Sequence, residues 1–145
     1  MSQNHDSRPS VFLDTSVLMQ YLRGASPESL LLSDRMLKRF RFAINPVVLS
    51  EVLLAADASR NATKLEQIRE AIQILPINDT ELNLLSDSLA RVRNRAIHTN
   101  DLLIYSTAIE CDYLLTEDED FKVLANGDRP VILTTAEFLQ QAERS

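Results

Sequence analysis

Ser10-Val-Phe-Leu-Asp14 is a short apolar run that ends in a carboxylate, and residues 15–22 follow it with apolar side chains at helical spacing. A continuous apolar run of this length is typical of a strand that is buried on both faces of a parallel sheet. Gly24 then ends the helical pattern, as glycine commonly does. The stretch predicts the first strand and helix of an α/β domain, with Asp14 at the carboxyl end of the strand.

The same order of strand and helix continues along the chain. Further strands are predicted at residues 42–44, 74–77, 113–116 and 131–133. The helices between them are predicted at residues 27–39 with Ser26 as cap, 46–56 opened by Asn45-Pro46, 61–72, 79–95, 102–110 opened by Asn100-Asp101, and after the cap Thr135. This alternation predicts one α/β domain at residues 10–142, with helices on both faces of a parallel sheet and a disordered tail at residues 1–9.

The scarce residue types exclude several kinds of site. Gly24 and Gly127 are the only glycines, so a glycine-rich phosphate loop or dinucleotide turn is excluded. Cys111 is the only cysteine, and His5 and His98 are the only histidines, which excludes a disulfide within the chain and a zinc site rich in Cys or His. No uncharged stretch exceeds nine residues, and the polar start has no apolar signal region, so we expect a cytoplasmic protein without a membrane span.

The net charge of −6 comes from 21 Asp and Glu against 15 Lys and Arg. Phosphate binding draws largely on Lys and Arg, so an acidic chain at first disfavours a nucleic-acid partner. If four acids gather at one metal site, 17 acids remain against 15 bases, and the rest of the surface is close to −2. The acidity therefore leaves a nucleic-acid substrate open.

Carboxylates lie where an open α/β sheet binds its ligands, at the carboxyl ends of the strands. Asp14 and Asp118 follow predicted strands, and Asp101 opens the helix before the fourth strand. Glu51 is the one acid of an otherwise apolar helix. Grouped carboxylates repel one another unless a divalent cation neutralises them, and oxygen ligands select Mg²⁺ or Mn²⁺ over zinc. Because such an ion activates water and stabilises charge on phosphate oxygens, the pattern favours phosphodiester hydrolysis.

Each acid also has an ordinary structural interpretation. Asp101 is a good helix cap, and Asp14 suits a turn at a strand end. Glu51 could occupy the solvated stripe of its helix, and the acidic run at residues 117–120 could be a solvated loop.

The residues around these acids resemble the successive motifs of the PIN-domain family. Four segments match in order: Val11-Phe-Leu-Asp14-Thr-Ser, Pro46-Val-Val-Leu-Ser-Glu51-Val, Asn100-Asp101-Leu-Leu-Ile-Tyr-Ser-Thr-Ala108 and Leu114-Leu-Thr116-Glu-Asp118-Glu-Asp-Phe121. The resemblance covers about residues 10 to 140. It implies a three-layer, Rossmann-like α/β domain with a central parallel five-stranded sheet and a Mg²⁺- or Mn²⁺-dependent endoribonuclease site. For small bacterial members it also implies the toxin of a type II toxin-antitoxin pair of the VapBC type, with RNA as substrate and an antitoxin protein as partner.

The same resemblance assigns roles to individual residues. Four acids match the metal-binding and catalytic positions: Asp14, Glu51, Asp101 and Asp118. Ser16 and Thr116 match hydroxyl positions that support the carboxylates. Acidic neighbours crowd Asp118, where the family often has a basic or neutral residue, so Asp120 is the substitute for the fourth acid.

Two basic clusters are candidate RNA contacts. Arg91, Arg93 and Arg95 lead into the Asp101 motif, and we expect them to contact phosphates. The other cluster consists of Arg35, Lys38, Arg39 and Arg41, for which a solvated helix face is the better interpretation. His98 is either an exposed loop residue or a proton shuttle.

The helix at residues 47–56 is apolar around nearly its whole circumference, which predicts burial on more than one side. Together with Leu30, Leu31 and Leu32, its surplus apolar surface predicts a homodimer formed through the first half of the chain. The family resemblance implies the same pairing. The alternative is that the helix at residues 61–72 covers this surface within one chain.

Three other functions compete with the nuclease. A haloacid-dehalogenase-like phosphatase has Asp-x-Asp at its first strand, whereas Asp14-Thr-Ser16 lacks the second acid. A receiver domain has paired acids before its phosphoacceptor and a late lysine, and neither is evident. The third alternative is a non-catalytic PIN-like interaction module whose acidic pocket binds only a metal or a partner.

Overall fold

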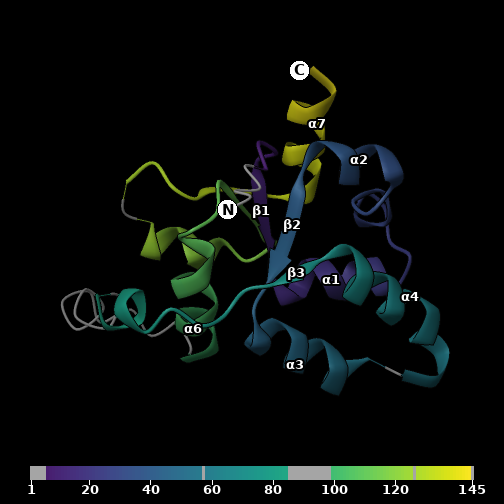
Figure 1. Cartoon of the computed structure of the whole chain (residues 1–145), viewed down its shortest axis with the longest axis horizontal. Coiled ribbons are helices and arrows are strands. Elements are labelled where there is room, and N and C mark those ends of the chain that lie inside the picture. The colour runs from purple at the N-terminus through teal and green to yellow at the C-terminus, as the bar shows by residue number, and fades with distance from the viewer. Residues whose placement is uncertain (1–5, 57, 85–98, 126, 145) are drawn as a thin grey trace, which may run out of the picture.

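The computed structural model describes residues 6–56, 58–84, 99–125 and 127–144, and its centre is a parallel sheet of five strands (Figure 1). The strands are β1 (Ser10–Leu13), β2 (Arg41–Ile44), β3 (Gln73–Ile74), β4 (Tyr113–Leu115) and β5 (Val131–Leu133). Their order across the sheet is β3-β2-β1-β4-β5, and every pair is parallel. The predicted five-stranded parallel sheet is confirmed.

The central strand is β1, and all of its residues are buried, as its continuous apolar run requires. Val11 aligns with Phe42 of β2 on one side and with Tyr113 of β4 on the other. The chain builds β2 and β3 outward from one side of β1 and then returns to place β4 and β5 on the other side. The strand order therefore reverses between β1 and β4, and α/β sheets bind their ligands at such a switch point.

Helices flank the sheet. They are α1 (Thr15–Leu22), α2 (Asp34–Arg39), α3 (Pro46–Ala55), α4 (Ala58–Ala71), α6 (Thr99–Ala108) and α7 (Thr135–Arg144), with short 3₁₀ turns η1 (Glu28–Leu30) and η2 (Glu119–Leu124). In the view of Figure 1, α6 lies on one side of the central strands, and α1, α3 and α4 group together on the other. Residues 79–84 are helical, and the rest of the helix predicted at 79–95 lies outside the described residues. The boundaries of the predicted domain stay a prediction.

The single helix predicted at residues 27–39 is wrong. The segment forms η1 and then, separately, α2. Ser33 ends the first turn and caps the next helix, because its side chain accepts a hydrogen bond from the backbone N–H of Met36 at 3.4 Å. A serine hydroxyl that bonds the backbone in this way favours a new helix start over a helix interior.

The third strand is shorter than predicted and begins earlier. It covers Gln73–Ile74 rather than 74–77, although the N–H of Leu75 still donates to the carbonyl of Ile44 at 2.8 Å. Pro76 follows and has no N–H to continue the ladder, so strand pairing ends there.

The cap of the last helix is Thr134, not the predicted Thr135. The hydroxyl of Thr134 accepts from the N–H of Glu137 at 3.2 Å, and its N–H donates to the Glu137 carboxylate at 2.9 Å. This reciprocal pair is a capping box. Thr135 is the first helical residue and is buried.

Among the residues that the structure describes, helix α3 is buried on one side only, so the predicted burial of a second side is not found within one chain. Val48 and Val52 face the core, whereas Leu53 is 39% and Leu54 88% exposed. Leu31, which was expected to add to an exposed surface, is a core residue at 1% exposure. The outer face of α3 is therefore not covered by the residues that the structure describes. No helix among them is long and apolar enough to cross a membrane.

Candidate active site

Asp14 lies at the point where β1 ends and α1 begins, and it is 5% exposed. Its Oδ1 accepts the N–H of Thr15 at 2.8 Å, which makes it the N-cap of α1. Its Oδ2 accepts the hydroxyls of Ser16 at 3.0 Å and Thr116 at 2.8 Å. Thr116 directly follows β4, so the carboxylate is fixed from both strands at the switch point of the sheet.

Burial raises the pKa of Asp14, and the negative charge of Asp101 raises it further. The hydrogen bonds from Thr116, Ser16 and Thr15 favour the charged form but do not cancel the effect of burial. Within the described part of the chain, no Lys or Arg forms an ion pair with Asp14. A cation bound beside Asp14 would therefore stabilise the charged form of this carboxylate.

Glu51 is half-buried in the middle of α3 and lies beside the same helix start. Its Oε1 accepts the hydroxyl of Thr15 at 2.7 Å, and its Oε2 accepts the side-chain amide of Asn100 at 3.3 Å. Thr15 thus donates its N–H to Asp14 and its hydroxyl to Glu51. The two acids, 37 positions apart in the sequence, share one bridging residue.

Asn45 holds the helices that carry the acids against one another. It is fully buried, and its Oδ1 accepts the N–H groups of Val47 and Val48 at 3.1 Å to cap α3. Its Nδ2 donates to the Leu103 carbonyl at 3.1 Å and to the Thr107 hydroxyl at 3.0 Å in α6. The sequence indicates the cap, but nothing in it indicates the bond to α6.

Asp101 lies in the first turn of α6 and is half-buried. Its charge acts on Asp14, and its neighbour Asn100 bonds Glu51. The first turn of α6 therefore faces both of these acids, and Asp14, Glu51 and Asp101 gather at one end of the sheet.

Asp118 immediately precedes the turn η2, and Asp120 lies on it. Asp118 caps η2, because its Oδ1 accepts the N–H of Asp120 at 2.9 Å. Its own N–H donates to the Thr116 hydroxyl at 2.9 Å, so Thr116 connects this turn to Asp14. Ser16 makes a similar connection, since its hydroxyl accepts the N–H of Glu117 at 3.4 Å. The choice between Asp118 and Asp120 stays a prediction.

The acids supply the oxygen ligands that a hard divalent cation prefers. Burial disfavours the charged form of Asp14, and a bound cation would offset this effect. In residues 6–56, 58–84, 99–125 and 127–144, however, no group of three or more His, Cys, Asp or Glu is arranged to hold an ion. Both oxygens of Glu51 are engaged by Thr15 and Asn100. The donor set thus fits a magnesium or manganese ion, although the side chains are not drawn together around one point.

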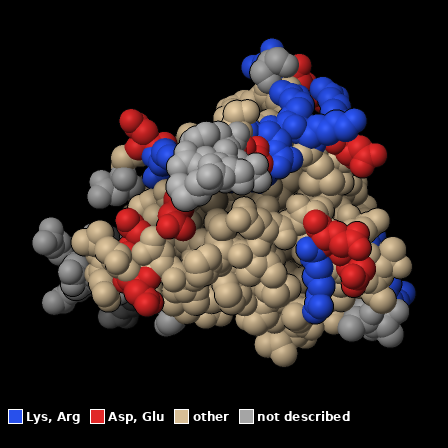
Figure 2. Space-filling view, in the orientation of Figure 1, with Lys and Arg blue, Asp and Glu red and all other residues tan. Residues whose placement is uncertain are grey.

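The basic residues that were candidate RNA contacts divide into two groups. Arg91, Arg93 and Arg95 lie outside the described residues, as does His98. The other cluster surrounds α2 and the amino end of β2, opposite to the end at which Asp14 lies. There Arg39 donates to the Ala142 carbonyl at 2.8 Å, and Figure 2 shows Lys and Arg gathered at the pole of α2 and α7.

Comparisons with known proteins agree with this geometry. The model of the PIN domain matches residues 11–127. VapBC2 from Rickettsia felis, bound to a DNA fragment from its promoter, is 22% identical, with a TM-score of 0.71 over 86% of this chain and 98% of that chain. VapBC-1 from nontypeable Haemophilus influenzae is 17% identical, with a TM-score of 0.62 over 86% and 97%. Mycobacterium tuberculosis VapC20, a toxin that cleaves the sarcin-ricin loop, is 12% identical, with a TM-score of 0.59 over 81% and 97%.

A comparison with curated proteins gives no match. The family model nevertheless spans most of the chain, from β1 through η2. Its range includes each of the four acid-bearing segments and four of the five strands, β1 to β4. This chain therefore belongs to the PIN-domain family.

Proposed function

We propose that this protein is a Mg²⁺- or Mn²⁺-dependent endoribonuclease of the cytoplasm and the toxin of a type II toxin-antitoxin pair. The observation that carries the proposal is Asp14, a buried carboxylate at the switch point that is held by three donors beside a second acid, Asp101. Thr15 adds Glu51 to the same site. Membership of the PIN-domain family and the likeness to a toxin that cleaves the sarcin-ricin loop support RNA as the substrate.

In this proposal Asp14, Glu51 and Asp101 hold the ion, with Asp118, or Asp120 in its place, as the fourth acid. The bound ion supplies a more acidic water and stabilises charge on the phosphate oxygens. Ser16 and Thr116 aim one oxygen of Asp14, and Thr15 and Asn100 orient Glu51. These four residues keep Asp14 and Glu51 in place, and none of the four carries a positive charge that would compete with the ion.

The phosphatase alternative is disfavoured by the residue two positions after Asp14, whose hydroxyl donates to Asp14 at 3.0 Å. This residue, Ser16, occupies the position where that family has its second acid.

Removal of the metal should abolish cleavage reversibly. We expect the purified protein to cut a single-stranded RNA in Mg²⁺ or Mn²⁺, to stop in EDTA and to recover when excess Mn²⁺ is added, because only a cation neutralises the grouped acids. Gel analysis of end-labelled RNA measures this. Cleavage that is indifferent to EDTA would contradict the proposal.

An antitoxin is the proposed partner. Several similar structures are toxin-antitoxin complexes, including one from Klebsiella pneumoniae. A short reading frame beside this gene that encodes a small DNA-binding protein, which binds the chain and suppresses cleavage, would support the assignment.

We further propose a homodimer formed through α3. Leu54 at 88% exposure and Leu53 at 39% leave an apolar face that α4 does not cover, and a two-fold dimer is the commonest way to bury such a face. Leu54→Glu should convert the dimer to a monomer in sedimentation at micromolar concentration. Val123→Glu, at another exposed apolar position, is the matched control and should stay dimeric. A wild-type monomer would refute the dimer.

A further inference from the structure

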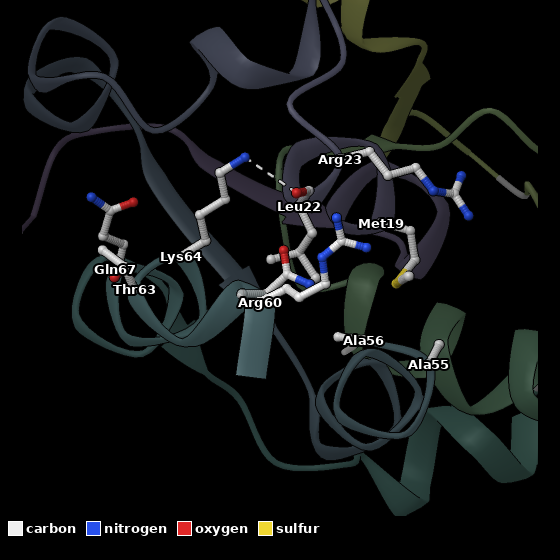
Figure 3. A pocket seen from close by; sticks show the side chains of 10 residues that line it. Met19, Leu22, Arg23, Ala55, Ala56, Arg60, Thr63, Lys64 and Gln67 are labelled. Carbon is white, nitrogen blue, oxygen red and sulfur yellow. Dashed lines mark hydrogen bonds between the residues drawn. The ribbon is translucent and has the colours of Figure 1, made fainter. Parts of the chain in front are cut away.

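A groove lies between the end of α1, the end of α3 and the first half of α4 (Figure 3). Its volume is about 730 Å³, which is within the range of ligand sites in proteins. Met19 and Leu22 of α1 and Ala55 and Ala56 at the end of α3 supply its apolar lining.

Among the described residues that line this groove, the charged side chains are all basic. They are Arg23, Arg60 and Lys64. Three smaller cavities each contain carboxylates, among them Glu70 in two of them and Asp118 in the third. In a chain with 21 acids against 15 bases, a cavity whose described lining carries three bases and no acid is unlike the other three.

Lys64 also has a structural role, because it bonds the backbone of α1. Its Nζ donates to the carbonyls of Leu22 at 3.2 Å and Tyr21 at 3.4 Å, at the carboxyl end of α1. The lysine thereby compensates the negative end of that helix dipole. One of its three hydrogens is left for a ligand.

Arg23 and Arg60 are different, because neither side chain forms a hydrogen bond or an ion pair with a residue that the structure describes. Both are exposed. Arg60 and Lys64 are also four residues apart on one helix, and in Figure 3 both extend from α4 toward α1. Like charges at this spacing repel one another on a helix, so a bound anion would relieve their repulsion.

The groove begins close to the candidate active site. The helix α1 runs from Thr15, beside Asp14, to Leu22 in the groove, a length of about 12 Å for an eight-residue helix. In α3, Glu51 lies one turn before Ala55. An RNA chain bound at the acids can therefore continue along these helices into the groove.

We propose that this groove binds the phosphate backbone of single-stranded RNA next to the cleavage site, with Arg23 and Arg60 on phosphates and Lys64 beside them. The inference rests on the proposed nuclease function and names the path of its substrate. RNA is favoured over other anions because it carries a charge on each nucleotide, which matches the three cations of one groove that α1 connects to Asp14.

The binding test uses an Asp14→Asn chain, which should not cut its ligand, and a fluorescent single-stranded RNA followed by anisotropy. Each phosphate contact adds about 0.7 to the salt slope of single-strand binding, or about fivefold in affinity at 0.1 M salt. Arg23→Gln with Arg60→Gln should therefore weaken binding by about 25-fold and lower the slope by about 1.4. Arg69→Gln, an exposed arginine on α4 outside the groove, is the matched control and should change neither.

Unchanged affinity and slope in the double variant would overturn the inference, and this is the result expected if the groove instead binds an acidic protein segment. Absence of RNA binding by the Asp14→Asn chain would overturn it too. Cleavage separates the two proposals: with Asp14 restored, the double variant should show a raised KM and a kcat within about twofold, since it changes binding shared by substrate and transition state. A wild-type chain that binds RNA through these arginines without cutting it would refute the nuclease and support the groove.

Discussion

Asp14→Asn is expected to lower RNA cleavage by at least about 100-fold. Residues that merely orient metal ligands typically contribute 10- to 100-fold, so loss of a ligand that lies at the centre of the hydrogen-bond network should exceed that. The amide can keep the bond from the Thr15 N–H and donate to the hydroxyls of Ser16 and Thr116, so the fold should persist. Initial cleavage rates on labelled RNA in saturating Mn²⁺ measure the effect.

The same substitution should stabilise the metal-free protein at neutral pH. Burial raises the pKa of Asp14 above its ordinary value of 3.8, so the folded chain binds a proton more tightly than the unfolded chain does. The stability contributed by this group is present below pH 3.8 and is lost as pH rises through the higher folded pKa. Asparagine has no such charge, so the gain in the free energy of unfolding should be largest at neutral pH and should shrink toward acidic pH.

Asp128→Asn is the matched control for both measurements. Asp128 is exposed and precedes the amino end of β5. It therefore lies at the end of the strands opposite to the end that carries Asp14. It should leave cleavage and stability nearly unchanged. Full cleavage by the folded Asp14→Asn chain would instead favour the non-catalytic interaction module, and a stability gain that is independent of pH would contradict the role of burial.

Phe121→Ala is expected to lower the free energy of unfolding by about 3–5 kcal/mol, the typical range for an aromatic core residue. Phe121 is 2% exposed, and its ring centroid lies 6.4 Å from that of Tyr105 in α6. It anchors η2, the turn that Asp118 caps, against α6. Because 1 kcal/mol corresponds to about 2–4 °C in a chain of this size, calorimetry should show a melting temperature about 6–20 °C lower.

Val123→Ala separates core packing from a change in the turn itself. Val123 belongs to the same η2 turn but is 41% exposed, so its truncation should change the free energy of unfolding by no more than about 0.5 kcal/mol. Equal destabilisation by the two substitutions would show that η2 is not held by the Phe121 anchor.

The sequence determined the sheet and the place of Asp14. Residues 10–13 are a continuous apolar run, which only a strand covered on both faces can bury, and the polar residue that ends it falls at the ligand-binding edge. The strands at residues 42–44, 113–116 and 131–133 could be predicted for the same reason, because apolar runs and turn residues determine strand formation within a few positions. Helix starts were harder to predict because neighbouring residues can each serve as the cap. The caps are Ser33 and Thr134, whereas Ser26 and Thr135 were predicted.

Only the tertiary structure decided the contacts between distant segments. Thr15 bonds Glu51, and Asn45 bonds α6, across more than 30 positions of the sequence. The groove likewise brings Arg23 together with Arg60 and Lys64, which lie more than 30 positions later. The sequence indicated basic clusters at 35–41 and 91–95 because those residues are close along the chain, and it gave no sign of Arg23 with Arg60. The physical reason is that local patterns fix which face of a helix is apolar, whereas the angle and depth at which helices pack depend on many weak contacts that no short stretch of sequence contains.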